Sequence, residues 1–148
     1  MNTVDEILDF AIDQEQQAAD FYADVAQRAE TPDMKKMLLD FHDEEKHHKK
    51  ILQDVKSGEH ELAPEQKILD LKISDYLVEV EFSENISYQD ALIIAMKKER
   101  AAYQLYTDMA AKIPDSHLRE VLVGLAKEEE KHKLFFEREY DERILTDN

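Results

Sequence analysis

The chain has 148 residues and a formal net charge of −16, from 35 acidic and 19 basic side chains. This length fits one domain with a single core, and the acidic balance argues against nucleic-acid binding, which needs clustered lysine and arginine. The absence of cysteine excludes disulfides, thiolate metal sites and a cysteine nucleophile. No apolar run approaches the roughly 20 residues of a membrane span and no N-terminal segment resembles a signal peptide, so we expect a cytoplasmic protein without a membrane partner.

Helix-forming residues dominate the sequence, and only 2 Gly and 3 Pro are available for turns. Apolar residues recur at three- and four-residue steps through four long segments, as in amphipathic helices. No strand pattern of comparable length competes with them. The predicted helices cover about residues 4–29, 32–56, 88–112 and 116–143, with a connection over residues 57–87.

Helix-capping residues mark where these segments begin. Thr3 and Glu6 fit a capping box. Thr31 can cap the second helix, and Pro32 suits its first turn. Ser87 opens the third helix in the same manner, and a second proline-containing break separates the third helix from the fourth. The short breaks predict two helical hairpins.

The connection between the hairpins has about thirty residues, which is too long for a plain turn. A second helix of about 25 residues is ~37 Å long, and a chain that returns from one end of it to the other needs that reach. Apolar residues between positions 64 and 80 indicate a short helix of its own. The predicted fold is therefore all-α: one domain over residues 1–148, a four-helix bundle with one long crossover that contains a short helix.

The two predicted hairpins carry the same motif at a constant offset of 84 residues. The segment AIDQEQQAADFYADVA (11–26) recurs as AMKKERAAYQLYTDMA, and DEEKHHKK (43–50) recurs as KEEEKHKL. Each half carries a lone Glu followed by a Glu-x-x-His. The offset pairs six ionisable residues: Glu15 with Glu99, Glu45 with Glu129, and His48 with His132. Four helices that supply such a set are typical of a dinuclear carboxylate metal site.

Charge supports two cations at these six residues. Glu15 and Glu99 lie on helix stripes that are otherwise small or apolar, and an unpaired buried ion costs several kcal/mol. Four carboxylates carry −4, which two divalent ions with neutral imidazoles would cancel. Oxygen and imidazole ligands without thiolate suit iron or manganese and tolerate zinc. Either the lone Glu pair or the Glu45 and Glu129 pair could bridge the two ions.

An overlapping motif, Glu44 with His47, competes with Glu45 and His48 for the same role. Under the 84-residue offset His47 falls on Lys131, which is a poor ligand while charged. We therefore interpret Glu44 and His47 as outer or solvated residues.

Tyr22 and Tyr106 each follow a lone Glu by seven residues, two turns along the same helix face. Each could be a core aromatic residue whose hydroxyl finds a partner. Each could also donate a hydrogen bond to a ligand carboxylate on a neighbouring helix, and the two interpretations are compatible.

These residues resemble the ferritin-like superfamily, and most specifically rubrerythrin-like proteins, over nearly the whole chain. The likeness lies in Glu15 with the Phe21-Tyr22 pair, in the run Glu44-Glu45-Lys46-His47-His48, and in their repeats around Glu99 and Glu129. It implies a di-iron centre that reduces hydrogen peroxide or oxidises ferrous iron, and by analogy a homodimer. The ligands so implied are Glu15, Glu45, His48, Glu99, Glu129 and His132.

The chain departs from that family in two respects. Rubrerythrins carry a cysteine-rich domain that feeds electrons to the metal site, whereas this chain has no Cys, so the resemblance implies a separate electron-donor protein. They also place a further Glu one turn after the third-helix ligand, where this chain has Ala102. The expected set is thus a more symmetric one of four Glu and two His.

Three functions compete on the sequence alone. The first is an oxidoreductase that reduces hydrogen peroxide or dioxygen at a dinuclear iron centre. The second is iron binding and storage with ferroxidation as the only chemistry, which needs a closed cage. The third is a non-redox, zinc-binding or purely structural bundle.

Overall fold

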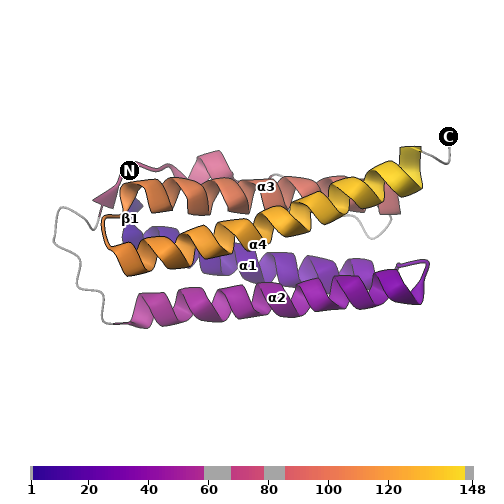
Figure 1. The fold of residues 1–148 in the computed structure, drawn as a ribbon, viewed down its shortest axis with the longest axis horizontal. Helices are drawn as coiled ribbons and strands as arrows, with labels where there is room; N and C mark the ends of the chain where they lie inside the picture. Colours follow the sequence, from indigo (N-terminus) through magenta and orange to yellow (C-terminus); the bar gives the residue numbers. More distant parts are fainter. Residues whose placement is uncertain (1, 59–67, 79–85, 146–148) are drawn as a thin grey trace.

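The structure, a computed structural model, describes residues 2–58, 68–78 and 86–145, and it confirms the all-α four-helix bundle (Figure 1). The fourth helix continues into one π-helical turn, η3 (Asp141–Leu145). The long helices are α1 (Val4–Ala26), α2 (Pro32–Ser57), α3 (Tyr88–Lys112) and α4 (Ser116–Tyr140).

The predicted caps are formed at the beginnings of α1, α2 and α3. Thr3 and Glu6 make the reciprocal bonds of a capping box on α1. Thr31 accepts a hydrogen bond from the backbone of α2, and Ser87 does the same for α3. Helix α1 ends at Ala26 rather than at the predicted residue 29, because the next amides bond to carbonyls three residues back and tighten the chain into a turn.

Helix α1 packs mainly against α2, and α3 packs mainly against α4. Helix α2 ends, and α3 begins, at opposite ends of the bundle (Figure 1), so the connection spans its length as predicted. The short helix expected between residues 64 and 80 is a single 3-10 turn, η2 (Ile73–Tyr76); residues 64–67, 79 and 80 lie outside the described part. The Tyr76 hydroxyl donates to Asp108 of α3 at 2.6 Å and ties the crossover to the bundle.

Two very short strands were not predicted. Strand β1 (Asn2–Thr3) pairs antiparallel with β2 (Ile68–Leu69) of the crossover. Two residues cannot display an alternating pattern, so no sequence signal announces such a pair.

The core consists of two apolar clusters along the bundle axis, with a layer of buried polar side chains at the positions between them in each helix. One cluster is rich in Leu and Ile and contains Ile7, Leu52, Leu105 and Leu122. The other is rich in aromatic residues and contains Phe21, Tyr22, Phe41 and Phe136. None of the helices in the described ranges combines the length and apolarity that a membrane crossing requires.

Candidate metal centre

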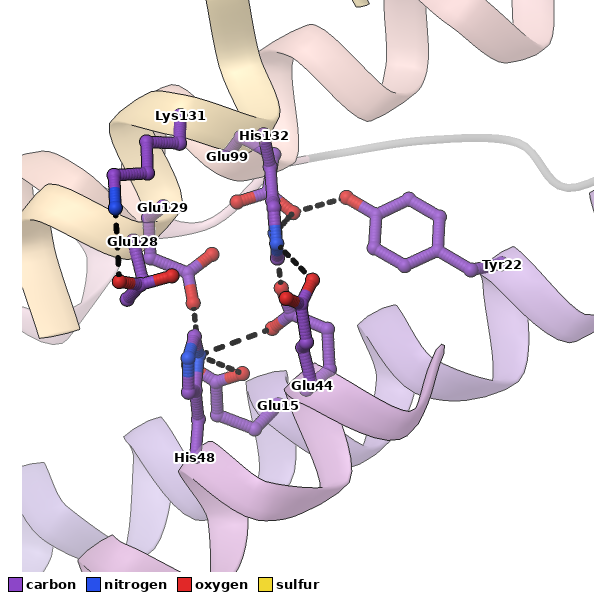
Figure 2. A network of polar contacts seen from close by, with 10 residues as sticks. Glu15, Tyr22, Glu44, His48, Glu99, Glu128, Glu129, Lys131 and His132 are labelled. Carbon is purple, nitrogen blue, oxygen red and sulfur yellow. Dashed lines mark hydrogen bonds and ion pairs between the residues drawn. The ribbon is translucent and has the colours of Figure 1, made fainter. Parts of the chain in front are cut away.

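The six predicted ligands all lie in this buried polar layer, and all four long helices contribute to it. Figure 2 labels each of them except Glu45. None of these side chains belongs to a residue more than 4% exposed. Helix α1 supplies Glu15, α3 supplies Glu99, and each of α2 and α4 supplies a Glu-x-x-His: Glu45 with His48, and Glu129 with His132. The one-turn spacing within each motif brings Glu and His to the same helix face.

The six residues form two overlapping groups of four, in each of which one ligand atom per residue lies within 4.8 Å of the others. The His48 half-site contains Glu15, Glu45, His48 and Glu129. The His132 half-site contains Glu45, Glu99, Glu129 and His132. Glu45 and Glu129 belong to both groups, whereas the lone Glu residues each belong to one. Of the two bridging arrangements left open by the sequence, the geometry favours the Glu45 and Glu129 pair.

Within the layer, the histidine of α2 contacts a carboxylate of α4, and the histidine of α4 contacts a carboxylate of α2. His48 of α2 places Nδ1 2.5 Å from Oε1 of Glu129, and His132 of α4 places Nδ1 2.9 Å from Oε1 of Glu45. The two imidazole rings are nearly parallel, with centroids 6.2 Å apart. Both histidines therefore turn the same ring nitrogen toward the carboxylates.

The two tyrosines make the matching cross-connection between α1 and α3. The Tyr106 hydroxyl donates to Oε1 of Glu15 at 2.5 Å, and the Tyr22 hydroxyl donates to Oε1 of Glu99. Each Tyr thus holds the lone Glu of the other hairpin by one oxygen. The second oxygen, Oε2, of both Glu15 and Glu99 is buried and makes no hydrogen bond to any of the described residues.

The carboxylates of the layer cannot all ionise together without cations. Burial, and then repulsion from the neighbouring carboxylates, raises the pKa of Glu45 and of Glu129 well above the usual value. Burial also acts to raise the pKa of Glu99, but hydrogen bonds from Glu129, His132 and Tyr22 hold it below the usual value. Despite burial, the neighbouring Glu99 and Glu44 raise the pKa of His132. Protons must therefore replace cations when no metal is bound.

Two divalent cations fit these residues. The orphaned Oε2 atoms of Glu15 and Glu99 are unused acceptors in a dry core, where a polar atom without a partner is costly. Four carboxylates balance two dications in charge, and every one of the six residues can offer an atom to at least one half-site. Carboxylate and imidazole ligands without thiolate suit iron or manganese and tolerate zinc.

One polar contact to the layer was not assigned by the sequence. Oε2 of Glu44 lies 2.7 Å from Nε2 of His132, while the other ring nitrogen, Nδ1, contacts Glu45 (Figure 2). The sequence indicated only that Glu44 is an outer or solvated residue. Its partner lies on another helix 88 positions away, and no spacing rule within α2 could reveal it.

A small cavity between α1 and α3 borders the polar layer. It has a volume of about 30 Å³, which is room for one or two water-sized molecules. Its walls are mainly apolar and include Ala18, Ala102 and Leu105, together with the half-buried Lys98 and with Tyr76 from the crossover. The carboxylates that border it are Glu15, Glu45, Glu99 and Glu129.

Comparison with known proteins agrees with this geometry. The family model for rubrerythrin matches residues 6–140. A Thermotoga maritima protein provisionally described as a ferritin-like diiron-carboxylate protein shares the fold, with a TM-score of 0.75, 19% identity and 95% of each chain covered. A hypothetical protein from Pyrococcus furiosus is 25% identical with a TM-score of 0.71, over 93% of this chain and 87% of that one. No curated protein matches the sequence.

Proposed function

The chain belongs to the rubrerythrin family, and on that premise we propose that it is an oxidoreductase that reduces hydrogen peroxide or dioxygen at a dinuclear iron centre. The observation that carries the proposal is the buried layer of four carboxylates and two imidazoles, divided into two overlapping half-sites. When bound, two adjacent ferrous ions would supply a pair of electrons to one O–O bond.

Each residue of the layer has a distinct place in this proposal. Glu45 and Glu129, which belong to both half-sites, would be shared by the two ions. Glu15 and Glu99 would each serve one ion through Oε2, while Tyr106 and Tyr22 hold their other oxygens in place. His48 and His132 would each complete one half-site through Nδ1.

The cavity beside the layer supports a small oxidant. Its volume of about 30 Å³ suits a molecule of two heavy atoms and not a larger organic peroxide. Ala18, Ala102 and Leu105 give the cavity an apolar wall beside the carboxylates, and apolar surroundings strengthen electrostatic interactions within the layer. Because the chain has no Cys, the reducing equivalents would come from a separate electron-donor protein.

The proposal is tested by loading the metal-free protein with ferrous iron anaerobically and mixing it with hydrogen peroxide or dioxygen in parallel. We expect two bound ferrous ions per chain, and the oxidation of two ions with the uptake of two protons for each peroxide reduced to water. Rapid optical measurement would rank the two oxidants. Bound ferrous iron that reacts with neither oxidant would refute the redox role.

The cavity provides a second arm of the same experiment. Ala102→Leu should fill the space next to Glu99 and slow the reaction with both oxidants, while two ferrous ions still bind. Ala111→Leu adds the same bulk to an exposed position of the same helix and should leave the rates unchanged. Equal rates in the two variants would show that the oxidant does not use the cavity.

Ferroxidation with iron storage is the second candidate, and Ala102 favours it. In rubrerythrins this position carries a further Glu, whereas here a methyl group lines the cavity. Storage requires a closed cage, so the mass of the protein in solution decides between the two: a homodimer excludes storage. Elemental analysis of protein produced with ample iron would separate both from a non-redox zinc protein.

A further inference from the structure

His132 is held on three sides, in a way that His48 is not. Its Nδ1 faces the layer, 2.9 Å from Glu45 and 3.5 Å from Glu99. Its Nε2 lies 2.7 Å from Oε2 of Glu44. The ring of Phe41 covers it, with centroids 4.2 Å apart and planes inclined by 30°. Both the position and the rotation of this imidazole are therefore restrained before any cation arrives.

The contact with Glu44 also favours one position for the ring proton. A carboxylate oxygen accepts a hydrogen bond from a ring N–H, so this contact favours Nε2 of His132 as the donor. A neutral ring that keeps its proton on Nε2 has its lone pair on Nδ1, the atom that faces the carboxylates. This is the form that binds a cation, and a carboxylate partner also makes the ring a more basic ligand.

The corresponding restraints are missing around His48. Under the 84-residue offset Glu44 corresponds to Glu128, whose carboxylate pairs with Lys131 at 3.3 Å instead (Figure 2). Phe41 corresponds to Leu125, which cannot stack on an imidazole. Among the residues that the structure describes, the one hydrogen bond of the His48 ring is made by Nδ1, to Glu129. No described residue bonds to Nε2 of His48, so no contact directs the proton of this ring to the nitrogen away from the carboxylates.

From these contacts we propose that Glu44 is a positioning residue for His132, and that it makes the His132 half-site bind the first and tighter of two cations. The inference rests on the proposed metal centre and adds an order of filling. Both half-sites contain the shared carboxylates Glu45 and Glu129, so the restraints on the two histidines set the order of filling. The His48 half-site would then accept the second cation more weakly.

Cobalt(II) provides a redox-independent test, because its visible absorption reports coordination without any oxidant. Anaerobic titration of the metal-free protein should show two ions binding in two steps. Glu44→Ala should weaken the tighter step by about 10- to 100-fold, the usual effect of removing a carboxylate that orients a ligand histidine. Glu44→Gln keeps an oxygen that can accept from Nε2, so its affinity should lie between those of Glu44→Ala and the unmodified protein.

Glu128→Ala is the matched control. Its side chain is 42% exposed, compared with 47% for Glu44, and it occupies the equivalent position in the other hairpin. It should leave both steps unchanged. Equal losses in Glu44→Ala and Glu128→Ala would overturn the inference, because a general effect of surface charge would then explain both.

Single-histidine variants give an independent measurement. His48→Ala should retain the tighter ion, and His132→Ala should retain only the weaker one. The reverse order would contradict the inference, as would two equal steps in the unmodified protein. Failure of the unmodified protein to bind any cobalt would instead refute the metal centre itself, so the two failures are distinguishable.

Discussion

Two apolar clusters flank the polar layer, and the 84-residue offset relates one to the other. The cluster beside His132 contains Phe41 and Phe136, whereas the corresponding positions of the other cluster are Leu125 and Leu52. Phe21 likewise corresponds to Leu105. Within the layer, by contrast, every ligand and both tyrosines have an identical counterpart. The two hairpins share the polar residues of the layer and differ in the apolar residues that pack beside it.

This difference follows from what each region demands. A carboxylate or imidazole in a dry layer must meet particular partner atoms, since an unpaired buried charge is strongly destabilising. An apolar cluster demands only the right volume and pattern, so Leu can replace Phe if neighbours adjust. The divergence nevertheless reaches the layer at one point, because Phe41 covers His132 while Leu125 lies at the position related to it.

The largest effect is expected from the carboxylates shared by both half-sites. Glu45→Gln and Glu129→Gln should each reduce bound metal from two ions to one or none, because each removes a charged ligand from both groups at once. Glu15→Gln and Glu99→Gln should each remove mainly one ion. Metal stoichiometry by elemental analysis measures this. Unchanged stoichiometry in both variants would contradict the ligand assignment.

Metal removal should reverse the direction in which the stability of the protein changes with pH. The raised pKa values of Glu45, Glu129 and His132 mean that the folded metal-free protein binds more protons than the unfolded chain does. Its free energy of unfolding should therefore fall as the pH rises above about 4.5. The slope is about 1.4 kcal/mol per pH unit for each extra proton that the folded protein holds. The lowered pKa of Glu99 has the opposite effect. The stability that this carboxylate contributes is lost only as the pH falls into the acid range.

The metal-loaded protein is the control for this prediction. Cations compete with protons for the same ligand atoms, so its stability should rise with pH over the range in which the metal-free form weakens. Thermal unfolding of chelator-treated and zinc-loaded protein between about pH 5 and pH 8 measures both trends. Parallel curves would show that protons and cations do not share the layer.

The smallest effect is expected from the two apolar clusters. Phe41→Leu makes the aromatic cluster resemble its aliphatic counterpart and should lower the free energy of unfolding by about 1–2 kcal/mol, through the space left beside His132. Leu125→Phe, the reverse change, should destabilise by a similar amount through overpacking. Denaturant unfolding of the metal-free protein separates these effects from metal binding. An unchanged free energy of unfolding in both variants would mean that each cluster accepts the residue of the other without a packing cost.

Much of the fold followed from local signals. Thr3, Thr31 and Ser87 marked three helix beginnings because an N-cap side chain bonds to backbone two or three residues away. The end of α1 and the two-residue strands escaped prediction. They depend on how a turn tightens and on which segment meets Asn2 and Thr3, and neither is a property of the nearby sequence.

The candidate site was also predicted only in part. The identity of the six ionisable residues was visible because the same spacing occurs twice, and a repeated register excludes chance placement such as that of His47. The partner of Glu44 was not visible, because it lies on α4 while Glu44 lies on α2. The cavity beside Ala102 was equally hidden, since it is formed by two hairpins and the crossover together.

The sequence by itself determined that this protein is a helical bundle with two copies of a Glu and Glu-x-x-His set on buried helix faces. Periodicity and repetition are one-dimensional properties, and a carboxylate on an apolar stripe already requires a partner. Only the tertiary structure decided that Glu45 and Glu129 are shared between half-sites and that Glu44 reaches His132. Those contacts depend on how α2 and α4 are rotated and placed against each other, which is set by the packing of the whole core.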